Sequence, residues 1–141
     1  MTLATSNATG ELAVRVYYED TDTGGVVYYA NYLKFFERAR TEWLRALGMD
    51  QRQLAAQEQM MFVVRHAEIA YRQPARLDDL IHIRTTVADL RASTLVFHQQ
   101  ALRDGELLAS ANVQVCTVHA TTFKPIRLSP SIRDLLNKAL R

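Results

Sequence analysis

Two carboxylates and two glycines lie close together between Asp20 and Tyr28, in the run Asp-Thr-Asp-Thr-Gly-Gly-Val-Val-Tyr. This run follows an alternating, strand-like segment and precedes a long amphipathic pattern that is typical of a helix. The acidic residues and glycines are therefore expected in a loop that opens a helix. Free backbone N–H groups at a helix start can hold a developing negative charge, and a carboxylate beside them can act as a base or a nucleophile.

The segments on either side of this loop predict the elements that hold it. Residues 12–18 alternate in the manner of a strand, and apolar side chains recur at steps of three or four over residues 32–47. The second pattern predicts a helix of about four or five turns, ended by the left-handed residue that Gly48 can supply. Asp50 predicts the N-cap of a short helix that runs to residue 57.

The second half of the chain predicts strands at residues 61–72, 80–90, 94–103 and 107–119, and a final helix at 131–140 after Ser129-Pro130. The connections between these strands are too short for parallel crossovers, so the sheet is expected to be antiparallel. One long helix cannot cover both faces of five strands. The sequence therefore predicts an α+β fold in which the sheet wraps around that helix, with open edges and an outer face that favour self-association.

Composition narrows the class of protein. The 141 residues predict one domain over residues 11–141, after a flexible segment at 1–10. The single cysteine, Cys116, forms no intrachain disulfide, and no cysteine and histidine spacing suggests a metal site or another cofactor. With neither a leader nor a run long enough to span a membrane, we expect a soluble, cytoplasmic protein. A net charge of +2 argues against nucleic acid as a partner.

Two stretches carry a family resemblance. Residues 17–43, which begin Tyr-Tyr-Glu-Asp-Thr-Asp-Thr-Gly-Gly-Val-Val-Tyr-Tyr, and residues 71–79, Tyr-Arg-Gln-Pro-Ala-Arg-Leu-Asp-Asp, resemble the hotdog-fold acyl-CoA thioesterases. The resemblance is strongest to the YbgC-like branch of the 4-hydroxybenzoyl-CoA thioesterase family, which is associated with the Tol–Pal system. It covers about residues 12–136. It implies a hotdog fold, hydrolysis of an acyl-CoA or acyl-carrier-protein thioester, a homodimer or homotetramer, and a link to Tol–Pal.

The resemblance also implies roles for individual residues. The family's catalytic carboxylate falls on Asp22, as nucleophile or general base, and the backbone N–H that polarises the thioester carbonyl falls on Tyr29. YbgC-like members often carry histidine at the position of Tyr29, so only the backbone role carries over. Gly25, with Gly24, is expected to let the backbone approach the substrate. Isolated basic side chains are candidates for the phosphates of coenzyme A: Arg65, Lys124 and Arg127.

The same residues have other interpretations, and their spacing bears on each. The structural alternative for Asp22 is a helix cap or an Asx-turn residue with no part in catalysis. Asp20 is expected to orient the loop. A calcium loop would need an acid where Asn31 stands, and a phosphatase of the Asp-x-Asp type would need a parallel sheet. A hotdog hydratase would need a histidine near the motif. The alternative function is a non-catalytic module that binds an acyl carrier or a Tol–Pal partner.

Overall fold

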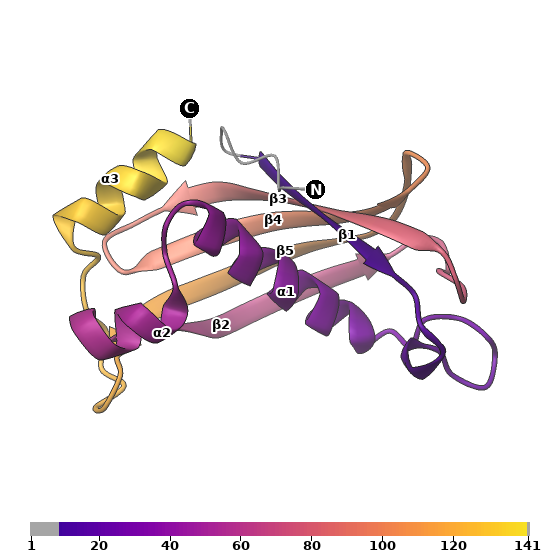
Figure 1. Ribbon diagram of the computed structural model, residues 1–141, viewed down its shortest axis with the longest axis horizontal. Coiled ribbons are helices and arrows are strands. Elements are labelled where there is room, and N and C mark those ends of the chain that lie inside the picture. Colours follow the sequence, from indigo (N-terminus) through magenta and orange to yellow (C-terminus); the bar gives the residue numbers. More distant parts are fainter. Residues whose placement is uncertain (1–8, 141) are drawn as a thin grey trace.

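The computed structural model describes residues 9–140, which form one antiparallel sheet, one long helix and several shorter helical segments (Figure 1). In chain order they are β1 (Thr9–Arg15), the 3-10 turn η1 (Tyr18–Asp20), α1 (Asn31–Ala46), α2 (Gln51–Gln53), the π turn η2 (Leu54–Glu58), β2 (Met60–Tyr71), β3 (Leu80–Leu90), β4 (Thr94–Arg103), β5 (Glu106–His119) and α3 (Pro130–Ala139). Of the segment expected to be flexible, residues 1–8 lie outside the described residues, whereas Thr9 and Gly10 already belong to β1.

The strands are ordered β1-β3-β4-β5-β2, and every neighbouring pair is antiparallel. β1 and β2 therefore form the two edges. Figure 1 shows α1 lying across one face of the sheet, with α3 at the end where the chain terminates. The predicted α+β architecture, five antiparallel strands around one long helix, is confirmed.

The core lies between α1 and the sheet. The side of α1 that faces the strands buries its aromatic and small side chains at steps of three or four: Tyr32, Phe35, Phe36, Ala39 and Trp43. The Trp43 ring meets Phe97 of β4 edge to face, with ring centroids 5.6 Å apart. A Cβ atom on Gly10 would come within 2.5 Å of Trp43 Cδ1, so β1 passes the indole at a point where only glycine fits.

A buried amide ties the helix to the sheet. Gln99 of β4 is fully buried, and its Nε2 donates to Phe36 O at 2.9 Å and to Thr85 Oγ1 at 3.0 Å. Its Oε1 accepts from Arg40 Nη1 at 3.0 Å. Burial lowers the pKa of Arg40, and the nearby Glu37 carboxylate opposes that change. The polar group in the core is thus paired on both its nitrogen and its oxygen, as buried groups must be.

The largest difference from prediction is at the end of β1. The strand predicted to reach residue 18 ends at Arg15, because Val16 pairs with a distant loop. The Val16 N–H donates to Asp79 O at 2.9 Å, and Asp78 N–H donates to Val16 O at 3.0 Å. The chain then turns, and Tyr18–Asp20 form η1. Among the described residues, no helix combines the length and the apolar character that crossing a membrane demands.

Candidate active site

Asp22 lies on a tight turn between η1 and α1. Its N–H donates to Val26 O at 3.0 Å, and its carbonyl accepts from Gly25 N–H at 3.0 Å. One carboxylate oxygen, Oδ1, accepts from Gly24 N–H at 2.9 Å. The other, Oδ2, accepts no hydrogen bond from residues 9–140, and the side chain is exposed. The carboxylate is therefore anchored through one oxygen and open to a reactant through the other.

The two glycines of this turn are needed for different reasons. A Cβ atom on Gly24 would stand 3.2 Å from Asp22 Oδ1, closer than ordinary van der Waals contact. Gly25 has a φ of +77° and has nothing within 4 Å of the place a Cβ would occupy. Gly24 therefore leaves room for the carboxylate, and Gly25 supplies the left-handed backbone of the turn. The sequence predicted a close approach of backbone to substrate, and that role stays a prediction.

The start of α1 leaves two N–H groups free. The N–H groups of residues 31–33 donate to carbonyls three residues earlier, at 2.8–3.2 Å. The N–H groups of Tyr29 and Ala30 donate to no atom of the described residues. Ala30 is the N-cap and provides no side-chain cap, and the first turn contains no acidic residue. The partial positive charge of the helix start is therefore not neutralised from within its own first turn.

Asp20 braces the loop, as the sequence predicts. Its Oδ2 accepts from Tyr17 N–H at 2.9 Å. Its backbone carbonyl accepts from Tyr28 N–H at 3.1 Å and from Asn31 Nδ2 at 2.8 Å. Since these bonds join both ends of the loop, Asp20 fixes the distance between the turn at Asp22 and the start of α1.

An open hollow of about 530 Å³ lies beside the turn. Its lining comes from the loop and from one residue of the β2–β3 connection: Tyr18, Thr21, Asp22, Thr23, Gly25 and Leu77. The hollow is wide enough to admit a flexible chain next to the exposed carboxylate. Asp22 and Gly25 thus share one concave surface, and Tyr29 follows at the start of α1.

Tyr71, the last residue of β2, is a site residue that sequence reasoning missed. Its hydroxyl donates to the Tyr29 carbonyl at 3.1 Å, and the two rings meet edge to face with centroids 5.9 Å apart. Burial raises the pKa of the Tyr71 phenol and the neighbouring Tyr29 raises it further, so Tyr71 keeps its proton and remains a donor. The two residues are 42 positions apart, which no local pattern could connect.

The predicted phosphate-binding residues lie elsewhere on the chain. Arg65 is exposed at the bulge in the middle of β2. The Lys124 carbonyl accepts from His119 N–H, and His119 pairs with Met60 at the opposite end of β2 from Tyr71. A strand rises about 3.3 Å per residue, so the eleven steps from Met60 to Tyr71 span roughly 36 Å. Within one chain, Asp22 and Gly25 line one hollow and Tyr29 lies at the start of α1, whereas Arg65 and Lys124 lie outside that hollow.

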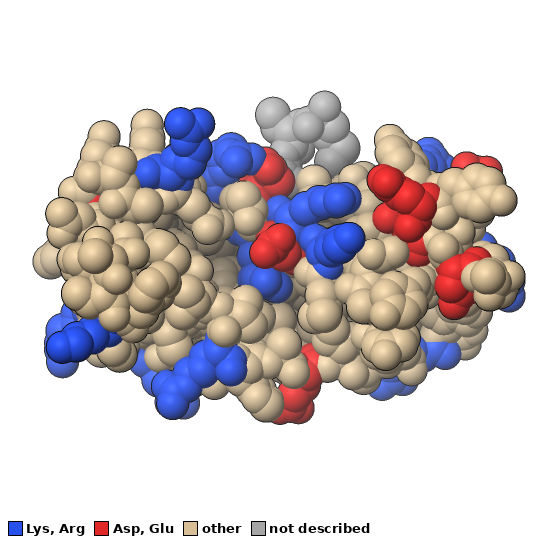
Figure 2. Space-filling model, turned by 90° about the horizontal axis from the view of Figure 1, so that it is seen from below, with Lys and Arg blue, Asp and Glu red and all other residues tan. Residues whose placement is uncertain are grey.

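Charge on the surface is mixed. Figure 2 shows acidic side chains interspersed among the Lys and Arg side chains on the face seen from below. Within residues 9–140, no group of three or more His, Cys, Asp or Glu side chains is arranged to hold a metal ion. The histidines occupy separate strand positions and have their own neighbours, as with His98 Nδ1 and Asn112 Oδ1 at 3.0 Å.

Comparisons with known proteins agree with this architecture. The family model of the thioesterase-like superfamily matches residues 16–136. The chain is 45% identical over 120 residues to the acyl-CoA thioesterase YbgC of Haemophilus influenzae, covering 85% of this chain and 88% of that protein. It is 48% identical to the acyl-CoA thioester hydrolase YbgC of Escherichia coli, covering 84% and 89%.

Solved structures extend the comparison to the fold. A probable thioesterase from Bartonella henselae superposes with a TM-score of 0.83 at 38% identity, over 86% of this chain and all of that one. A 4-hydroxybenzoyl-CoA thioesterase complexed with 4-hydroxybenzoyl-CoA shares the fold, with a TM-score of 0.86 at 17% identity over 92% and 99% of the two chains. The predicted hotdog fold is thereby confirmed. With a family model matched over most of its length and relatives at 45% and 48% identity, the chain belongs to the thioesterase-like superfamily and, within it, to the YbgC acyl-CoA thioesterases.

Proposed function

We propose that this protein, a thioester hydrolase by family, converts an acyl-CoA to the free acid and coenzyme A with Asp22 as the reacting carboxylate. One observation carries the assignment. Asp22 lines an open hollow with one oxygen held by Gly24 and the other free, on the loop that opens into α1. The free oxygen is thus accessible to a substrate that enters the hollow.

The helix start supplies the complementary group. The Tyr29 N–H lacks an acceptor within the described residues and belongs to the uncapped positive end of α1. Placed against the thioester carbonyl, it would stabilise the negative charge that develops on the carbonyl oxygen. Loss of one such donor typically costs about 3 kcal/mol, or a hundredfold or more in rate.

Two routes share this arrangement. Asp22 either attacks the carbonyl carbon and forms a mixed anhydride that water then hydrolyses, or it takes a proton from a water molecule that attacks directly. In both routes the C–S bond breaks and coenzyme A leaves as a thiolate. A thiolate is a good leaving group, so the site requires no strong general acid.

The free edge of β2 completes the proposal. Residues 64–68 of β2 are exposed, and Val64 leaves 52% of its surface uncovered in the isolated chain. Pairing of β2 with its counterpart about a two-fold axis would join two sheets into one of ten strands and cover the β2 edge of each subunit. Antiparallel pairing sets the Met60 end of one strand beside the Tyr71 end of the other. Arg65 and Lys124 of the partner subunit would then approach the Asp22 loop, where the phosphates of coenzyme A would lie.

The oligomer is tested in solution. We expect a dimer, or a tetramer in which the outer faces of the sheets are also covered, and no active monomer. Light scattering at micromolar concentration measures the mass. A value near the 16.1 kDa of one chain, together with full activity, would refute both the edge pairing and the shared site.

The role of Asp22 is tested by a matched pair of variants. Asn keeps the shape of Asp and its hydrogen bond from Gly24 but neither attacks a carbonyl nor takes a proton. Asp22→Asn should therefore lose more than about nine-tenths of turnover in a thiol-release assay, because the variant lacks the reacting carboxylate. Asp20→Asn is the control, since its amide oxygen can still accept from Tyr17 N–H. Retention of more than about a tenth of turnover by Asp22→Asn would show that the assignment is wrong.

The same assay, run on a panel of acyl-CoA and acyl-carrier-protein thioesters, identifies the acyl group and its carrier. Binding of these thioesters without release of thiol from any of them would favour the non-catalytic module. A cytoplasmic location and a Tol–Pal partner stay predictions from the sequence, to be examined by fractionation and by binding to purified Tol–Pal proteins.

A further inference from the structure

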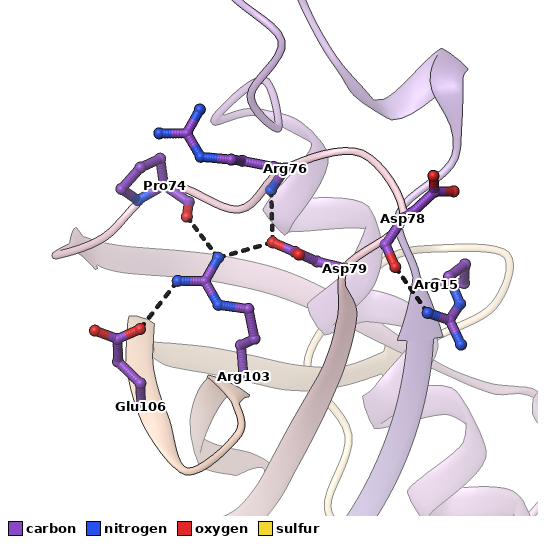
Figure 3. A network of polar contacts seen from close by, with 7 residues as sticks. All are labelled: Arg15, Pro74, Arg76, Asp78, Asp79, Arg103 and Glu106. Atoms are coloured by element: carbon purple, nitrogen blue, oxygen red, sulfur yellow. Dashed lines mark hydrogen bonds and ion pairs between the residues drawn. The ribbon is translucent and has the colours of Figure 1, made fainter.

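The guanidinium of Arg103 fastens the connection between β2 and β3 at two points. Figure 3 shows Arg103, at the end of β4, reaching over this connection. Its Nη1 donates to Asp79 Oδ2 at 2.7 Å and to Pro74 O at 3.1 Å, and its Nη2 donates to Glu106 Oε1 at 2.9 Å. Asp79 Oδ2 also accepts from Arg76 N–H at 2.8 Å. The Arg103 and Asp79 side chains keep only 24% and 23% of their surface exposed.

We propose that Arg103 and Asp79 are positioning residues of the thioesterase site, acting on Asp22 through the 74–79 connection. The proposal rests on the proposed function, because it assumes that Asp22 carries the reaction. Neither side chain needs to touch substrate for this role. Their task is to hold the segment against which the Asp22 turn is built.

The path from the guanidinium to the carboxylate is short and consists of hydrogen-bonded backbone. Ala75, between the two points held by Arg103, is almost fully buried, and its carbonyl accepts from Val27 N–H at 2.7 Å. Arg76 and Val26 form an isolated antiparallel bridge. Val26 O accepts from Asp22 N–H at 3.0 Å. A displacement of the connection would therefore move the strand-like pair Val26-Val27 and, with it, the Asp22 turn.

The connection is also held from its other side. Arg15 Nη1 donates to Asp78 O at 2.7 Å, as Figure 3 shows, and Val16 N–H donates to Asp79 O at 2.9 Å. Asp78 itself has a φ of +70°, in the left-handed region that Asp adopts more readily than most non-glycine residues. A segment held from β1 and β4 and bonded to the Asp22 turn is built to be rigid.

The ion pair of Arg103 with Asp79, the clamp on the 74–79 connection, stays formed at neutral pH. Burial raises the pKa of Asp79, but the Arg76 N–H and the Arg103 guanidinium outweigh burial and hold that pKa below its usual range. The Asp79 and Glu106 carboxylates raise the pKa of Arg103. Both partners are therefore charged whenever the enzyme is working, and charge-assisted hydrogen bonds of this kind are the stronger class.

The chain offers a matched control for the clamp. Asp79 and Glu106 both pair with Arg103 at nearly equal distances, but only Asp79 belongs to the connection that supports Val27. Glu106 lies on the neighbouring strand, at the start of β5. Asp79→Asn and Glu106→Gln each remove one negative charge that pairs with the Arg103 guanidinium. Comparing them separates an effect on the position of the site from the stability that any ion pair of Arg103 contributes.

The experiment compares steady-state kinetics with amide hydrogen exchange. Asp79→Asn should lower kcat about tenfold and leave KM within about threefold, since a shift well under 1 Å in a reacting group is enough for that loss. The same variant should speed exchange at the Val27 N–H and not at the core strand β4. Glu106→Gln should change kcat less than about twofold. Arg103→Lys, which keeps the charge but cannot span three acceptors, should resemble Asp79→Asn.

Three results would overturn the inference. The first is a folded Asp79→Asn with wild-type kcat. The second is an equal loss of kcat in Glu106→Gln, and the third is a rise in exchange spread over the whole sheet, because either of these would mean a general loss of stability. If Asp79→Asn does not fold, Arg103→Lys provides the same comparison. Failure of the proposed function gives a different pattern, in which wild-type protein releases no thiol while exchange at Val27 still responds to Asp79→Asn.

Discussion

Gly24→Ala is the most direct test of how finely the Asp22 carboxylate is placed. Gly24 has a backbone conformation that alanine can adopt, because its φ lies outside the left-handed region. The new methyl group would stand 3.2 Å from Asp22 Oδ1, where ordinary contact begins at 3.4 Å. The same oxygen is held by the Gly24 N–H at 2.9 Å, so it cannot move away without stretching that bond. The substitution therefore pushes the carboxylate while leaving the rest of the turn in place.

The size of the effect follows from the displacement. Relief of the contact needs a shift of a few tenths of an ångström. Since a misplacement of about 1 Å costs roughly a hundredfold in rate, shifts of about 0.2 to 0.5 Å correspond to losses of about two- to tenfold. We expect this loss in kcat, with the free energy of unfolding changed by less than about 0.5 kcal/mol because the site is on the surface.

Gly25→Ala is the companion variant. Its methyl group would meet no atom within 4 Å, but alanine at a φ of +77° costs roughly 1–2 kcal/mol. Urea unfolding should therefore show the larger loss of stability for Gly25→Ala, and the thiol-release assay should show a loss of kcat for Gly24→Ala without a matching loss of stability. Wild-type kcat in Gly24→Ala would mean that the reaction does not depend on the position of this carboxylate, which would refute the reasoning.

Three further outcomes are expected. Gly10→Ala would drive a methyl group into Trp43 and should lower the free energy of unfolding in urea by about 1–3 kcal/mol. Tyr71→Phe loses the hydrogen bond to the Tyr29 carbonyl, worth about 1 kcal/mol, and should lower kcat about fivefold in the thiol-release assay. Tyr29→Phe leaves that bond intact, and its kcat should stay within about tenfold of the wild-type value. Because the pKa of Asp79 is depressed by folding, its carboxylate stabilises the protein above the unfolded value of about 3.9, and this contribution is lost as pH falls through the lower folded value. Urea titrations should therefore show wild type and Asp79→Asn converging in stability below about pH 4.

The strands in which apolar and polar side chains alternate regularly were predictable from the sequence. β3 and β4 begin and end at the predicted residues 80–90 and 94–103, because short turns bound them and apolar side chains alternate within them. The predicted cap at Asp50 is confirmed, since its carboxylate accepts from Arg52 N–H at 2.8 Å. The helix after this cap departs from prediction, because it becomes the π turn η2 before Gln59 takes a left-handed conformation.

Contacts between distant segments were not predictable. The predicted strand at residues 12–18 extends past its observed end because alternation continues beyond Arg15, although Val16 already pairs with the 78–79 connection. No local pattern indicates the contacts of Tyr71 and Arg103 either, since their partners lie 42 and 24 residues away. Local chemistry was enough to propose the Asp22 loop with its glycines, and the family resemblance added Tyr29 at the helix start. The parts that hold them in place depend on the fold.

The buried Gln99 has a consequence for the position of the start of α1. A slip by one helical turn would carry α1 along its axis by about 5.4 Å. Such a slip would strip the Gln99 amide of the Phe36 carbonyl and leave a buried donor unsatisfied, at a cost of about 1–3 kcal/mol. The amide therefore sets the longitudinal position of α1, and with it the location of the free N–H groups at the helix start. A core amide of β4 thereby bears on the position of the Tyr29 and Ala30 N–H groups, although it contacts neither residue.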